Sequence, residues 1–95
     1  DPEQAPTKAA MNSMTLALAR ALAPAIRVVA LSPGLAETDF VTGLDQAWWD
    51  EQSRRTPLQR LATPGDVAEA ALAIATRLTY SNGCIIPVDG GRPLT

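Results

Sequence analysis

The residue types that could do chemistry are few in this sequence and fall in two places. The chain contains no His, a single Cys (Cys84) and a single Lys (Lys8). Without His, neither a Ser-His-Asp nor a Cys-His catalytic group can be assembled, and the usual zinc ligand sets are excluded as well. What remains is the Lys8 ammonium near the start and a Pro33-Gly34 turn followed by Thr38.

The turn Ser32-Pro33-Gly34 comes directly after Ile26–Leu31, which is rich in β-branched residues and almost continuously apolar. That pattern is typical of a strand buried on both faces, as in a parallel sheet. Open parallel sheets bind ligands at the carboxyl ends of their strands, and glycine lets a backbone come close to a ligand. Pro33 and Gly34 are therefore expected at a sheet edge that suits a ligand-binding loop. The alternative is an ordinary strand-ending turn, which Pro-Gly also makes.

Three helices are expected around this loop. The Ala-, Leu- and Met-rich residues from about Thr7 to Leu22 are strong helix formers. A short helix is predicted around Leu44–Gln52. Thr63-Pro64-Gly65-Asp66 predicts the start of a helix over Pro64–Leu78, with Thr as N-cap, Pro in the first helical position and Asp in the first turn.

A second strand is predicted at Cys84–Val88, with Pro87 indicating a sheet edge because proline cannot donate to the ladder. Two strands joined through a helix imply a parallel pair with a right-handed crossover, and hence the α/β class. Parallel strands need neighbours and helices on both faces, so this sheet is expected to be incomplete on its own.

The motifs resemble the short-chain dehydrogenase/reductase family in unbroken order over nearly the whole chain. They are Thr7-Lys8-Ala9-Ala10, Leu18-Ala19-Arg20-Ala21-Leu22-Ala23-Pro24, Ile26-Arg27-Val28, Ser32-Pro33-Gly34 with Thr38, Thr56-Pro57-Leu58, Arg60-Leu61-Ala62-Thr63-Pro64, Asp66-Val67-Ala68 and Val88-Asp89-Gly90-Gly91. The resemblance implies that residues 1–95 are the C-terminal fragment of a single domain, a Rossmann-like doubly wound parallel sheet.

The resemblance gives Lys8 a catalytic and cofactor-binding role, as the Lys of the family's Tyr-x-x-x-Lys pair. Its ammonium would lower the pKa of the tyrosine phenol and hold the nicotinamide ribose. The alternative is a solvated residue of the first helical turn. The position four residues earlier holds Gln4, which does not titrate. Either the pair is broken, or residues near the start are absent or mis-joined. The family's catalytic Ser and Gly-rich pyrophosphate turn have no counterpart in this sequence.

The resemblance also places Pro33, Gly34 and Thr38 against the nicotinamide, as the family's P-G-x-x-x-T loop, with NAD or NADP as the cofactor. It implies that residues 35–63 form a substrate lid, in which Trp48 and Trp49 could cover an apolar substrate. The alternative is that one or both tryptophans pack this short helix onto the body of the protein.

The expected function is that of a NAD(P)-dependent oxidoreductase that transfers a hydride between nicotinamide and a carbonyl or alcohol substrate, as part of a larger subunit. The chain should be inactive alone. The alternative is a non-catalytic packing or oligomerisation module derived from the family. Expected partners are the missing N-terminal half, identical subunits, or both.

Composition also bears on nucleic-acid and membrane partners and on the cellular location. A single Lys and a net charge of −2 argue against a nucleic-acid partner. The sequence has no apolar run near the ~20 residues of a spanning helix, which argues against a membrane partner. The lone Cys84 fits a reducing compartment, so a cytoplasmic location is expected.

Overall fold

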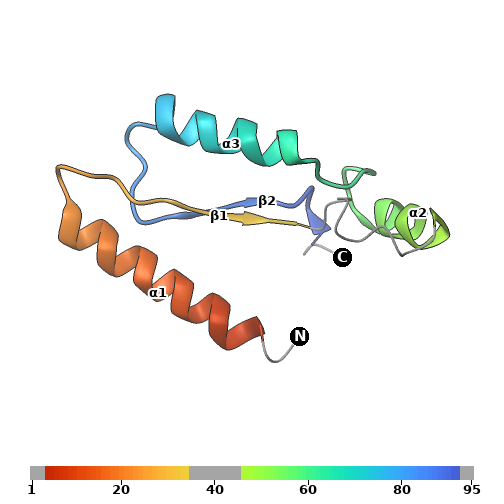
Figure 1. Ribbon diagram of the computed structural model, residues 1–95, viewed down its shortest axis with the longest axis horizontal. Coiled ribbons are helices and arrows are strands. Elements are labelled where there is room, and N and C mark those ends of the chain that lie inside the picture. Colours follow the sequence, from red (N-terminus) through yellow and green to blue (C-terminus); the bar gives the residue numbers. More distant parts are fainter. Residues whose placement is uncertain (1–3, 35–45, 93–95) are drawn as a thin grey trace. The chain divides into compact units, whose positions relative to one another are not determined.

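The computed structural model describes residues 4–34 and 46–92 (Figure 1). In chain order the elements are α1 (Gln4–Leu22), β1 (Ala30–Pro33), α2 (Gln46–Arg55), α3 (Pro64–Thr76) and β2 (Ile85–Val88). The two strands are hydrogen-bonded neighbours in a two-stranded sheet. They run parallel, because the backbone bonds that join them advance along both segments together, from Val28 with Gly83 to Gly34 with Val88. The predicted α/β class and the incomplete sheet are confirmed.

The first strand is shorter than predicted and lies later in the sequence, at Ala30–Pro33 instead of Ile26–Leu31. The reason is that the Val28 N–H donates to the Asn82 side-chain Oδ1 at 2.9 Å, in place of a backbone carbonyl of a neighbouring strand. The ladder begins only where the Ala30 N–H donates to Cys84 O at 3.0 Å. An apolar, β-branched run therefore located the strand but not its first residue.

The helices differ from the prediction at their ends. α1 begins at Gln4 instead of Thr7, and α2 continues to Arg55 instead of stopping at Gln52. α3 ends at Thr76 instead of Leu78. Beyond Thr76 both the Arg77 and Leu78 N–H groups donate to Ala73 O, at 2.7 and 3.0 Å, which closes the helix with a wider turn.

The chain forms two compact units: Asp1–Ala30 with Ala73–Ile86, and Leu31–Leu72 with Pro87–Thr95. In the first unit the Arg27 guanidinium closes the end of α3. It donates to Leu78 O at 2.8 Å and to Ile74 O at 3.1 Å. Carbonyls in the last turn of a helix have no partner within the helix. A cation there is also stabilised by the negative end of the helix dipole. Arg27 thus joins the segment before β1 to the end of α3.

Asn82 makes the matching link to α1 in the same unit. While its Oδ1 accepts from Val28, its Nδ2 donates to Ala19 O at 3.3 Å. The neighbouring Gly83 has a φ of 72°, and a Cβ there would lie 3.3 Å from the Ala19 Cβ. The chain passes close to α1 here in a left-handed backbone conformation that glycine adopts readily and other residues rarely adopt.

Most of α1 is exposed. Over residues 8–22 of the helix, the buried side chains are Thr15, at 6% exposure, and Ala19, at 4%. The large apolar side chains of the helix are exposed by 39–56%: Met11, Met14, Leu16, Leu18 and Leu22. The first unit therefore covers only a narrow strip of a helix whose composition predicts packing on two sides.

In the second unit, the start of α3 is held by a reciprocal capping arrangement. The Asp66 N–H donates to the Thr63 hydroxyl at 3.1 Å, and the Thr63 N–H donates to the Asp66 carboxylate at 2.8 Å. The Arg60 guanidinium binds both Asp66 oxygens, at 2.6 and 3.0 Å. The predicted N-cap Thr63 and first helical residue Pro64 are confirmed.

These contacts lower the pKa of Asp66 below its usual value, mainly through the Arg60 hydrogen bond and also through the Thr63 N–H. Because the folded pKa is lower than the unfolded one, the charged carboxylate stabilises the fold fully above about pH 3.9 and progressively less as the pH falls below it.

We predict that Asp66→Asn lowers resistance to urea at pH 7, and that its difference from the unsubstituted chain shrinks as the pH falls from 4 toward 2. Glu69→Gln, on the same helix, is the control. Equal urea midpoints for Asp66→Asn and the unsubstituted chain at pH 7 would contradict the capping role.

Candidate functional site

The predicted site residues fall in both units. Lys8 lies in the first turns of α1 and is exposed. Pro33 is the exposed last residue of β1 and Gly34 follows it directly, in the second unit. Thr38 lies outside the described residues. The structure thus brings Pro33 and Gly34 together at the carboxyl end of a parallel strand, the edge at which such sheets bind ligands.

Gly34 is packed tightly against the residue that follows β2. Its N–H donates to Val88 O at 2.9 Å. A Cβ at this position would lie 2.8 Å from the Asp89 Cα and 2.9 Å from the Asp89 Cβ, closer than real Cβ atoms come to such neighbours. The sequence suggested that glycine leaves room for a ligand. The structure shows that it leaves room for Asp89.

The turn Asp89–Arg92 does more than end the strand, although the sequence indicated only a turn. Gly90 has a φ of 62° and Gly91 one of 87°, and the Asp89 Oδ1 accepts from the Gly91 N–H at 3.0 Å. Gly90 O accepts from the Leu58 N–H at 3.1 Å. A Cβ on Gly90 would lie 2.8 Å from the Thr56 Cγ2. The turn is therefore where the segment after α2 packs.

Arg92 and Gln52 were not singled out by sequence reasoning. The Arg92 guanidinium donates to the Gln52 backbone O at 3.2 Å and to the Gln52 Oε1 at 2.9 Å. Gln52 is only 9% exposed. The two residues are forty positions apart, and no motif in the sequence relates them.

The two tryptophans of α2 differ in their surroundings. Their rings pack edge to face, with centroids 4.8 Å apart and an interplanar angle of 84°. Trp49 is 4% exposed and Trp48 is 38% exposed. Trp49 therefore packs the helix onto its unit, as the alternative interpretation held, whereas part of Trp48 remains open to solvent.

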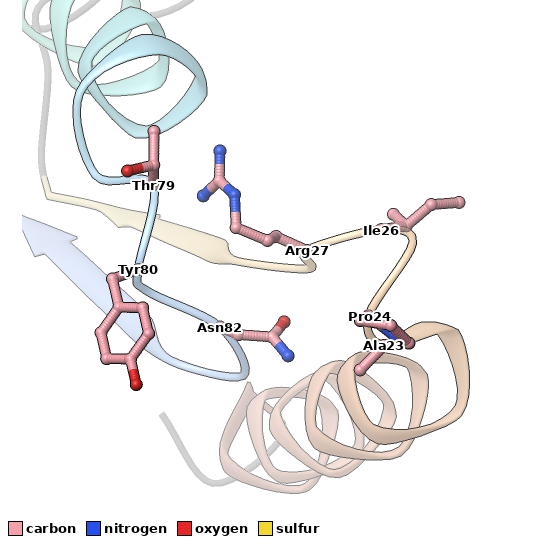
Figure 2. A pocket seen from close by; sticks show the side chains of 7 residues that line it. All are labelled: Ala23, Pro24, Ile26, Arg27, Thr79, Tyr80 and Asn82. Carbon is pink, nitrogen blue, oxygen red and sulfur yellow. The ribbon is translucent and has the colours of Figure 1, made fainter.

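The first unit has an open cavity of about 360 Å³ where the chain enters the two strands (Figure 2). It is lined mainly by apolar groups, from the residues after α1 and from the loop before β2: Ala23, Pro24, Ile26, Arg27, Thr79, Tyr80 and Asn82. Tyr80 is the single tyrosine of the chain and is fully exposed. Lys8 lies fourteen residues before the end of α1, about 21 Å along the helix axis, whereas the cavity lies beyond that end. Tyr80 is therefore not placed to act with Lys8.

Across residues 4–34 and 46–92, no three or more Cys, Asp or Glu side chains are grouped so that they could hold a metal ion. Within those ranges, too, no helix is long and apolar enough to cross a membrane.

Residues 3–92 match the family model described as enoyl-(acyl carrier protein) reductase. The 3α-hydroxysteroid dehydrogenase of Mediterraneibacter gnavus is 40% identical over 86 residues, which are 88% of this chain and 34% of the relative. The 3-oxoacyl-[acyl-carrier-protein] reductase of Chlamydia pneumoniae is 39% identical over 89 residues, which are 92% of this chain and 36% of the relative. The chain thus spans about a third of the length of these curated relatives.

Solved structures agree with the sequence match. A small-chain dehydrogenase crystallised in complex with NADPH superposes with a TM-score of 0.79 at 36% identity. That similarity covers 92% of this chain and 41% of the other. By sequence and by fold, the chain belongs to the short-chain dehydrogenase/reductase family.

Proposed function

We propose that residues 1–95 are the C-terminal part of a single Rossmann-type domain in a NAD(P)-dependent oxidoreductase, which moves a hydride between nicotinamide and a carbonyl or alcohol substrate. The match over residues 3–92 supports this, because it aligns the chain with relatives named as a reductase and a dehydrogenase. The NADPH complex of a similar protein supports nicotinamide as the cofactor class. NAD and NADP are both compatible with the residues of this chain.

The observation that carries the proposal of a larger subunit is the small core. Among the hydrophobic side chains of the described residues, only Ala19 and Trp49 are buried. A domain that folds by itself buries many more. The exposed apolar side chains of α1 therefore call for a covering surface, which the proposed N-terminal half, identical subunits or both would supply.

The chain offers groups for the nicotinamide end of the cofactor. In the proposal, Pro33, Gly34 and Thr38 form the loop beside the nicotinamide, and Lys8 holds its ribose. The Gly34 N–H is already bonded to Val88 O, so this loop must bind the ligand through its other polar groups. The pyrophosphate end would need a Gly-rich strand-to-helix turn, a pattern that this sequence does not contain. A segment outside these residues would have to provide it.

Bound nicotinamide would supply or accept the hydride. In the proposal, the ammonium of Lys8 stabilises the phenolate form of a tyrosine, which gives or takes the proton at the substrate oxygen. A phenol with its ordinary pKa of ~10 exchanges protons poorly at neutral pH. An adjacent cation stabilises the phenolate and so lowers this pKa. Lys8 is exposed on the first turns of α1, so its ammonium is open to such a partner. Gln4 occupies the position at which the family places that tyrosine.

Residues 35–63 are proposed as the substrate lid. Of these, the structure describes residues 46–63, which carry α2 and the loop to α3. The partial exposure of Trp48 supports the proposal, because an apolar ring at the surface of α2 can cover a carbonyl compound and exclude water from it. Trp49 contributes by fixing the helix.

A second candidate is a non-catalytic packing or oligomerisation module. The apolar exposure of α1 favours it, and so does Gln4, because an amide cannot replace a catalytic phenol. The residue that precedes Ala5 in the encoded protein separates the two candidates. A tyrosine there supports the enzyme, and a verified glutamine supports the module.

A cytoplasmic location is proposed for either, in keeping with the single Cys84, which forms no disulfide.

We predict that the 95-residue chain oxidises neither NADH nor NADPH with any carbonyl substrate, because it lacks the phosphate-binding turn and the catalytic tyrosine. Adding the upstream half of the same protein should restore nucleotide binding. Titration calorimetry with NADPH and NADH measures this. Turnover by the chain alone, or no binding by the reconstituted pair, would contradict the proposal.

In an intact protein with a tyrosine before Ala5, Lys8→Ala should lower kcat on the order of 100-fold, the contribution expected of proton-transfer chemistry. Its melting temperature should hardly change, because exposed substitutions are close to neutral for stability. Lys8→Arg should fold equally well and keep more activity, since it retains the positive charge. Arg20→Ala, further along α1, is the matched control and should leave kcat unchanged. Equal and mild effects of Lys8→Ala on activity and on folding would assign Lys8 to the solvated surface instead.

A further inference from the structure

We propose that Arg92 and Gln52 are positioning residues that fix the orientation of α2, and with it Trp48, over the substrate. The inference rests on the proposed function for the role of α2. Its geometry is independent of that function, because all the residues involved belong to the second unit and their contacts are direct.

The contact is a two-point hydrogen bond on one buried residue. The guanidinium donates to both the backbone O and the side-chain Oε1 of Gln52, at 3.2 and 2.9 Å. A planar guanidinium that binds two oxygens of one residue fixes the direction of the group as well as its distance. Gln52 is 9% exposed, so water competes little for these bonds. The pair therefore holds α2 against rotation about its own axis.

The location at the carboxyl end of α2 strengthens the contact. Gln52 O is one of the last carbonyls of the helix, which have no partner within it, and a cation is favoured there by the helix dipole. The Thr56 hydroxyl donates to the same oxygen at 2.9 Å, and Thr56 is 4% exposed. Its Cγ2 packs against Gly90. The helix end is thus fixed from two sides by the Asp89–Arg92 turn and the chain that packs on it.

Helical spacing transmits this orientation to the tryptophans. Trp48 lies four residues before Gln52 and Trp49 three before it, so all three share one side of the helix. Trp49 and Gln52 are buried, while Trp48 sits at the border of that side at 38% exposure. Rotation of α2 would expose Trp49 and move Trp48 away from its present position.

The same turn also contacts the proposed cofactor loop, since Asp89 packs against Gly34. Arg92 therefore belongs to a single turn that contacts Gly34 on one side and α2 on the other. Loss of its guanidinium should loosen α2, and should leave the Gly34 contact, which uses Asp89 and Val88, in place.

The test uses the intact protein, made up of this chain and its upstream segment, labelled with 5-fluorotryptophan. The ¹⁹F resonances are assigned with Trp48→Phe and Trp49→Phe. In Arg92→Gln, the Trp49 resonance should gain the H₂O/D₂O shift of an exposed ring. KM for the carbonyl substrate should rise about tenfold, the loss expected for a hydrogen bond to a charged group. kcat and the Kd for NADPH should change little.

Two further variants guard against simple misfolding. Arg54→Gln is the control and should behave as the unsubstituted protein, because the exposed Arg54 guanidinium pairs with Glu51 of the same helix among the contacts described. Arg92→Lys combined with Gln52→Glu replaces the two-point contact with an ion pair, which holds the distance but not the direction, so it should restore part of the Trp49 protection and part of the KM loss. If Arg92→Gln does not fold, the double variant is compared with Arg92→Lys alone. The Trp49 signal and KM of the double variant should then lie closer to those of the unsubstituted protein.

Unchanged ¹⁹F exposure and unchanged KM in folded Arg92→Gln would overturn the inference. So would a parallel loss of kcat, nucleotide affinity and melting temperature without a selective rise in KM, because that pattern marks a purely structural residue. If the intact protein turns over no carbonyl or alcohol at all, the proposed oxidoreductase function fails. The Trp49 signal still decides whether Arg92 and Gln52 orient α2.

Discussion

In the described residues, the helices carry more apolar surface than the two strands there can cover, and the proposals for this chain depend on that imbalance. The large side chains of α1 stand in solvent, and no large side chain among the described residues is fully buried. Burying a few hundred Å² of such surface at ~25 cal/mol per Å² is comparable to the entire stability of a small domain. We therefore propose that this fold requires a covering surface for energetic reasons.

Hydrogen bonds from a few polar side chains give each unit its local geometry. Arg27 closes the end of α3 and Asn82 joins α1 to the chain before β1. In the second unit Asp66 holds the start of α3, and Arg92 holds the end of α2. Each of these contacts satisfies backbone groups that the helices and strands leave open. They specify local structure, but individually they add too little stability to replace a hydrophobic core.

Local signals in the sequence predicted local structure well. Thr63, Pro64 and Asp66 predicted the start of α3 to the residue, because a capping interaction involves only near neighbours. The parallel pair followed from the order of helix and strand. By contrast, the strand boundary was wrong because it depends on Asn82, more than fifty residues from Val28 in the sequence.

In the candidate site, too, local features were predicted from the sequence and contacts between distant residues were not. The order of the motifs predicted that Pro33 and Gly34 lie at the carboxyl end of a parallel strand, and the structure has them there. The reason for the glycine could not be foreseen, because Asp89 approaches it from a distant part of the chain. Arg92 was missed for the same cause, since its partner Gln52 is recognised only when the fold brings the two together. The catalytic role of Lys8 remains a prediction, and so do the cofactor-binding roles of Lys8, Pro33, Gly34 and Thr38.

The requirement for a covering surface is tested most directly by the size of the 95-residue chain in solution. Sedimentation equilibrium at micromolar concentration should find particles heavier than the 10.0 kDa of a single chain, with a mass that rises with concentration. Adding the upstream half should convert them to a defined complex. A compact 10.0 kDa monomer that unfolds cooperatively, with the apolar face of α1 in water, would contradict this account.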